Sequence, residues 1–196
     1  MHQAAMILHP IQPRNSRFHI RSLPSLGSDR LAIVLGRRLD DGYHYFRKVT
    51  PAGLAEIETI VVGPGGTWTV MRAGLHGRFR RRNGHWYRWN GSTSSWIPWD
   101  AQPVNEARLA GHRLELYLER ATQPCDVEAV LVPEAGMEVG WERDQTPGIH
   151  VEADLERLAT LITRDEVLTP AQVDRIVALL DPRQPLPRLA TSSPQG

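Results

Sequence analysis

The sequence predicts an α/β domain in which a mixed central sheet contains antiparallel hairpins and is flanked by helices. Three observations indicate this class. Amphipathic helical stretches are interspersed with short runs of β-branched and aromatic residues, glycine-containing turns join several of these runs, and a separate apolar run at 127–133 is bounded by proline. Strands and helices are therefore expected to be mixed along the chain.

The length and composition are those of one globular domain with ragged ends. The chain has 196 residues, of which 41% are hydrophobic and 23% charged, so it can bury a core. Residues 1–27 contain three prolines and no sustained period, which predicts an extended arm with a short strand near 17–20. Residues 28–181 are expected to form the domain, and the proline-rich residues 182–196 a disordered tail.

The first half of the domain is predicted to begin with a helix and continue in strands. Ser28 is expected to cap an amphipathic helix that ends near Asp40, and residues 43–49 form an aromatic and β-branched strand. Residues 55–62 and 67–73 read as two strands joined by the tight turn at 63–66. Two more turn signals, Asn83-Gly84 and Asn90-Gly91, follow, so three hairpins in succession predict an antiparallel meander.

The second half is predicted to be mainly helical around one buried strand. Gln102-Pro103 suits a helix start, and the helix is expected to continue through residues 104–120. The apolar run 127–133 predicts a central strand. Two helices close the domain, at 153–162 and at 171–180, the second capped by Thr169 with Pro170 in its first position.

Composition limits the classes of function. The first 113 residues carry 16 Lys/Arg against 7 Asp/Glu and the rest carry 7 against 15, a polarity typical of a nucleic-acid face or of two halves that attract each other. No apolar run approaches the roughly 18 residues of a membrane span, and no secretory signal is evident, so we expect a cytoplasmic protein with no membrane partner. The single cysteine, Cys125, is interpreted as structural, and no histidine spacing suggests zinc.

One segment carries a family resemblance. In AEIETIVVGPGGTWTVMRAGLHG (55–77), the run 60–64 with Gly66 forms a "vvvGP.G" turn between strands, and Gly77 follows as a trailing glycine. Residues 102–106 and the closing apolar segments keep the same order. Over about residues 27–180 the chain resembles the nuclease-related domain family (NERD), a branch of the restriction-endonuclease-like PD-(D/E)XK fold. The resemblance implies that fold for the α/β domain.

The resemblance also implies where a nuclease would hold its catalytic residues. The family's metal-binding aspartate corresponds to Glu58, its glutamate to Met71 and its lysine to Ala73. A thioether is too soft to ligate Mg²⁺, and a methyl group carries no charge with which to stabilise a transition state. Arg72 is expected on the opposite face of the strand from Met71 and Ala73. We therefore expect a pseudoenzyme that needs no cofactor.

An active enzyme is the first alternative. If Asp29, Glu58 and Glu106 converged, they could hold Mg²⁺ or Mn²⁺ in a shifted site and support phosphodiester hydrolysis. Each residue also has a structural interpretation. Asp29 and Glu106 suit the first turn of a helix, and Glu58 could pair with a nearby arginine.

An arginine- and tryptophan-rich stretch at 72–99 indicates DNA or RNA binding. Guanidinium groups pair with phosphates, and exposed indoles stack on unpaired bases. Strand alternation places Arg78, Arg80 and Arg82 on one face, with Phe79 and Arg81 on the other. The candidate binding residues are Arg78, Arg80, Arg81, Arg82, Trp86 and Arg88. The competing interpretation is a solvated hairpin whose tryptophans cover the core, in a protein that serves as a scaffold for a protein partner or for homo-oligomers.

Overall fold

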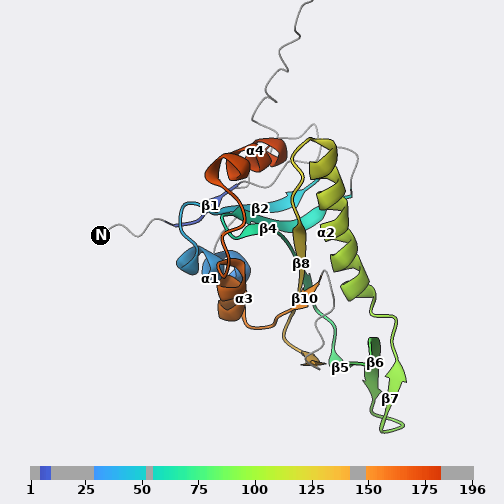
Figure 1. The fold of residues 1–196 in the computed structure, drawn as a ribbon. Coiled ribbons are helices and arrows are strands. Elements are labelled where there is room, and N and C mark those ends of the chain that lie inside the picture. Colours follow the sequence, from blue (N-terminus) through green and yellow to red (C-terminus); the bar gives the residue numbers. More distant parts are fainter. Residues whose placement is uncertain (1–4, 10–28, 52–54, 142–148, 182–196) are drawn as a thin grey trace, which may run out of the picture.

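The computed structural model describes residues 5–9, 29–51, 55–141 and 149–181 (Figure 1). Within these ranges the protein is α/β, with four helices and two mixed sheets. The predicted strand near 17–20 and the tail at 182–196 lie outside the described residues. The helices are α1 Arg30–Arg38, α2 Gln102–Arg120, α3 Leu155–Ile162 and α4 Pro170–Leu180. The strands are β1 Ile7–Leu8, β2 His44–Val49, β3 Ile57–Gly63, β4 Gly66–Ala73, β5 Gly77–Arg82, β6 His85–Asn90, β7 Ser95–Pro98, β8 Val127–Pro133, β9 Met137–Trp141 and β10 His150–Val151.

The helices begin where capping residues satisfy their first amide groups. Thr169 and Gln172 form a reciprocal capping box at α4, with proline in the first turn, as the sequence predicts. At α1 the cap is Asp29, whose carboxylate accepts the amide of Ala32, so the prediction of a Ser28 cap is wrong. Aspartate caps a helix as well as serine does, and here it is also held by other partners.

The predicted meander is divided between two sheets. The larger sheet has the order β1-β2-β3-β4-β8-β10, and β8 lies parallel to both of its neighbours. The smaller sheet has the order β7-β6-β5-β9. The chain therefore leaves the large sheet after β4, forms β5, β6 and β7, and returns through α2 to β8. Figure 1 shows β5, β6 and β7 beyond the start of α2, at the end remote from α4.

The core is built on both faces of the large sheet. On one face, α1 and α3 pack through Leu35 and Leu158 against strand residues such as Val61. On the other, α2 and α4 pack through residues such as Leu114 and Ile176. Alternate residues of β8 point to the two faces of the sheet. Both sets are largely apolar and buried, as expected of a central strand. The prediction of a central strand at 127–133 is confirmed.

The turn between β3 and β4 needs glycine because the chain is crowded there. A Cβ added at Gly63 would lie 2.1 Å from the ring of Tyr43, and one at Gly65 would lie 1.7 Å from the carbonyl oxygen of Ile162. The amide of Gly65 also donates to the Tyr43 hydroxyl. This hairpin is therefore fixed both to β2 and to the end of α3.

No helix in the described part of the chain is long and apolar enough to cross a bilayer.

Candidate functional site

The three positions that the resemblance assigns to catalysis, Glu58, Met71 and Ala73, lie in different surroundings. Met71 and Ala73 pack into the apolar cluster beneath α2, whereas Arg72 lies on the opposite side of β4, as alternation predicts. The Glu58 carboxylate accepts both the backbone amide of Arg72, at 3.0 Å, and its guanidinium, at 2.6 Å. Although partial burial opposes the charge, the Glu58 hydrogen bond raises the pKa of Arg72. Glu58 is thus the partner of an arginine.

Asp29 is buried in a second ion pair on the same side of the sheet. Its side chain is only 4% exposed. Besides capping α1, it accepts from the hydroxyl of Tyr45 and from the guanidinium of Arg47, each at 3.1 Å. Burial, together with the negative charge of Asp29, raises the pKa of Tyr45. The carboxylate of Asp29 is therefore neutralised from within the protein.

The proposed shifted metal site is not assembled in this structure. Glu106 is exposed on α2 and accepts from Gln102 of the same helix. The Glu58 and Asp29 carboxylates are held by Arg72 and Arg47 on the α1 side of the sheet. Among the described residues, no three His, Cys, Asp or Glu side chains are grouped so that they could hold a metal ion. The three carboxylates are separate structural features.

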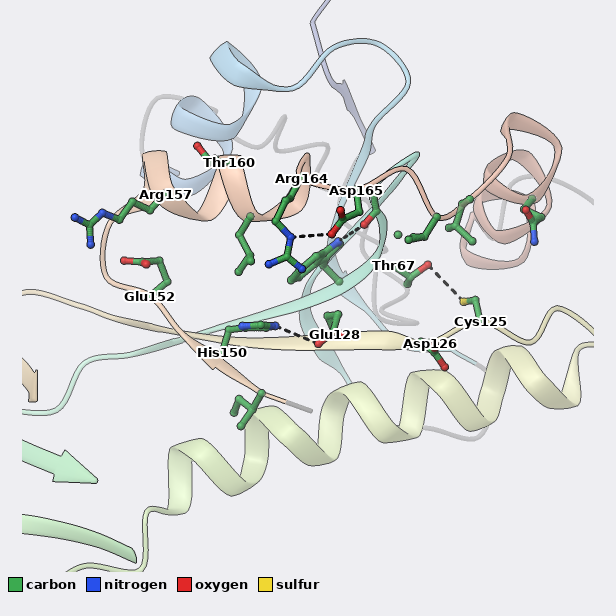
Figure 2. A pocket seen from close by; sticks show the side chains of 18 of the residues that line it. Thr67, Cys125, Asp126, Glu128, His150, Glu152, Arg157, Thr160, Arg164 and Asp165 are labelled. Carbon is green, nitrogen blue, oxygen red and sulfur yellow. Dashed lines mark hydrogen bonds and ion pairs between the residues drawn. The ribbon is translucent and has the colours of Figure 1, made fainter. Parts of the chain in front are cut away.

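A cleft of about 1020 Å³ lies at the edge of the large sheet. It lies between α3 and the β8–β10 edge (Figure 2). Figure 2 shows Arg157 and Arg164 on the α3 side and His150 beside Glu128 on the strand side. The His150 Nε2 lies 3.2 Å from the Glu128 carboxylate.

The cleft does not place a nucleophile beside a base. The Cys125 thiol contacts the hydroxyl of Thr67, while His150 pairs with Glu128 further along the cleft (Figure 2). Burial raises the pKa of the Cys125 thiol, so the reactive thiolate is disfavoured. Arg164 pairs with its neighbour Asp165 at 2.7 Å. The interpretation of Cys125 as structural stays a prediction.

The small sheet presents two different faces. Phe79 and Met137 are buried in the cluster near the start of α2, and Trp86 and Trp99 pack against the same cluster. We call the face of the small sheet that packs on this cluster the inner face and the opposite face the open face. It carries Arg78, Arg80, Arg82, His85, Tyr87, Trp89 and Trp96, all exposed or half-buried.

Arginines and aromatic rings contact each other across the open face. The Arg80 guanidinium lies 4.2 Å from the ring centre of Trp96 and 5.9 Å from that of Tyr87. The guanidinium of Arg78 lies 5.5 Å from the ring centre of Trp89. These are cation–π distances, and such contacts hold the side chains in place while leaving their charge unneutralised. Arg78 also has a weak exposed ion pair with Glu138 at 3.7 Å.

The six residues predicted to bind nucleic acid are divided between the two faces. Arg78, Arg80 and Arg82 share the open face. The other three, Arg81, Trp86 and Arg88, belong to the inner face, where the sequence analysis had already placed Arg81. The physical reason is the period of two along each strand, which sends Trp86 inward.

The rings missed by the prediction could have been found from the turn. Asn83 and Gly84 both have positive φ, as a two-residue hairpin loop requires. Such a loop fixes the register, here Arg82 opposite His85 and Arg80 opposite Tyr87. Counting outward from the turn along both strands therefore assigns His85, Tyr87 and Trp89 to the face that carries Arg78, Arg80 and Arg82. Trp96 follows because it lies opposite Trp89.

No protein-family model matches this sequence, and comparison with curated proteins and with solved structures gave no match.

Proposed function

We propose that this protein is a catalytically inactive nuclease-related domain that binds nucleic acid through the open face of its small sheet. The observation that carries the proposal is the row of Arg78, Arg80 and Arg82 set among aromatic rings on a face turned away from the core. Guanidinium groups bind phosphates, and aromatic rings stack on bases. This combination is typical of nucleic-acid-binding surfaces.

The charge on the open face is available to a polyanion. Arg80 is stacked on Trp96, and no carboxylate pairs with it among the described residues. Arg82 is exposed at the hairpin tip, again with no acidic partner in the part of the chain that the structure describes. By contrast, Arg47 and Arg72 are already paired with Asp29 and Glu58. Two of the three open-face arginines, Arg80 and Arg82, therefore have no carboxylate partner among the described residues.

The inactive assignment is supported by the chemistry at the nuclease positions. Met71 and Ala73 are packed in an apolar cluster, and the Glu58 carboxylate is bound by Arg72. Loss of one electrostatic group from a hydrolytic site costs about 10²–10³ in rate, so two losses leave little turnover. The restriction-endonuclease-like fold remains part of the proposal. The β3–β4 hairpin and the parallel β8 that follows α2 are consistent with it.

The test is the salt-dependent binding of labelled DNA and RNA, measured by fluorescence anisotropy. We expect the double variant Arg80→Glu/Arg82→Glu to weaken binding at least tenfold and to reduce the slope of log affinity against log salt, because phosphate contacts release counterions. The matched control is Arg108→Glu/Arg113→Glu on α2. Both of these arginines are exposed, and the net charge changes equally.

The control separates a local footprint from a general charge effect. Equal weakening by both double variants would show that only the net charge matters. Unchanged binding in the hairpin variant would remove the open face from the proposal. A protein that binds no nucleic acid at low salt would favour the scaffold interpretation.

A further inference from the structure

The open face repeats one unit along the hairpin. The register places Arg80 opposite Tyr87 and Arg82 opposite His85, and Arg78 lies over Trp89. Each unit is thus one guanidinium on β5 and one ring on β6. Side chains directly opposite in an antiparallel pair share a face, so all three units point the same way.

The repeat distance is set by the strand. Antiparallel strands rise about 3.4 Å per residue, so the units, two residues apart, recur about every 6.8 Å. Phosphates of one strand rise about 3.4 Å per nucleotide along a duplex axis, but the strand winds around that axis, so successive phosphates lie farther apart than this rise. The arginine row therefore suits consecutive phosphates of one nucleic-acid backbone, and the rings on β6 distinguish a single strand from a duplex.

The arginine row and the ring row lie side by side. Adjacent strands are about 4.8 Å apart, so each arginine on β5 has a ring on β6 beside it. Trp96 on β7 stands against Trp89 with ring centres 5.4 Å apart and widens the aromatic row at one end. The cation–π contacts of Arg78 and Arg80 arrange both rows before any ligand arrives.

We infer that the open face selects single-stranded nucleic acid and binds it with its backbone along β5, one nucleotide per arginine–ring unit, over three nucleotides. The inference rests on the proposed function and narrows its ligand class. Paired bases stay stacked inside a duplex and cannot lie flat on Tyr87, whereas unpaired bases can. Duplex DNA would contact the arginines alone.

The experiment compares four ligands on the full chain at one salt concentration: oligothymidylates of two to eight nucleotides, an abasic strand of eight nucleotides, an eight-nucleotide RNA strand and a duplex. We expect affinity to rise steeply up to three nucleotides and only slowly beyond. The single strands should bind at least tenfold more tightly than the abasic strand and the duplex, because stacking on each base contributes about that factor or more.

A pair of variants assigns the stacking to one ring. Tyr87→Phe should keep the preference for bases over abasic sites, and Tyr87→Ala should reduce that preference about fivefold or more. If Tyr87 only stabilises the hairpin, its removal would weaken the binding of base-containing and abasic strands equally. The ratio of these two affinities is therefore the informative readout. Circular dichroism checks that each variant is folded.

The outcomes distinguish the two proposals. If no ligand binds, the proposed function fails. If the duplex and the abasic strand bind as tightly as the single strands, the open face is a plain phosphate-binding surface, and only the inference about single strands is overturned. An affinity that rises evenly with length beyond three nucleotides overturns the three-unit footprint.

Discussion

The buried carboxylate of Asp29 offers the most direct test of how the large sheet is held to α1. Asp29→Ala removes three interactions at once: the cap on the Ala32 amide, the acceptor for the Tyr45 hydroxyl, and the counter-charge of Arg47. The Asp29 side chain is 4% exposed and that of Arg47 is 23% exposed. Solvent therefore cannot replace the lost partners fully.

The expected loss follows from these three contributions. A lost aspartate cap costs about 1 kcal/mol. A buried hydroxyl left without its acceptor costs about 1–3 kcal/mol. Breaking a buried ion pair costs about 3–5 kcal/mol, towards the low end here because Arg47 retains some contact with solvent. Since the three share one network they do not add, and we expect a total loss of about 3–5 kcal/mol.

The assay is urea unfolding at pH 7, followed by tryptophan fluorescence and by circular dichroism. Asp29→Asn keeps the cap and an acceptor for Tyr45, so it should recover at least about 1 kcal/mol of the loss. Asp41→Ala removes the same charge from an exposed position, and its effect should stay within about 0.5 kcal/mol. A loss below about 1 kcal/mol in Asp29→Ala would refute the account of a buried, internally neutralised carboxylate.

Three further predictions concern the turn, the histidines and catalysis. Gly65→Ala should destabilise the protein by about 1–3 kcal/mol through its clash with the Ile162 carbonyl, while Gly91→Ala, where a Cβ would meet no atom within 4 Å, should change the melting temperature little. Burial lowers the pKa of His44 below 6.5, so the folded state binds fewer protons than the unfolded state. Its contribution is fully present above pH 6.5 and is lost as pH falls towards the lowered folded pKa. His44→Asn should therefore flatten the dependence of the urea midpoint on pH over that interval. Purified protein should not hydrolyse DNA in Mg²⁺ or Mn²⁺, and a chelator-sensitive activity abolished by Glu58→Ala would contradict the inactive site.

Local chemistry predicted most of the elements. The Thr169 cap with its following proline, the Gly63–Gly66 turn and the proline-bounded strand at 127–133 all lie where short-range signals put them. These signals depend on backbone conformation and on neighbours within a few residues, and both can be read along the chain. The alternation of side chains along a strand also assigned Arg78 and Arg80 correctly to one face of the hairpin.

The pairing between distant segments could not be read in this way. Three consecutive hairpin signals are equally compatible with one meander and with two sheets. Only the packing of β4 against β8, with α2 across them, places β5 in a second sheet. Trp86, which the sequence analysis named as a binding candidate, lies on the inner face.

The sequence alone determined the α/β class, the turns and the Thr169 cap, because each is a property of residue type or of near neighbours. Only the tertiary structure decided that Asp29 and Glu58 are bound by Arg47 and Arg72. It alone also gathered Trp96 with Arg80 on one face. Side-chain charges and rings act over a few ångströms, and separation along the chain does not reveal which of them folding brings that close.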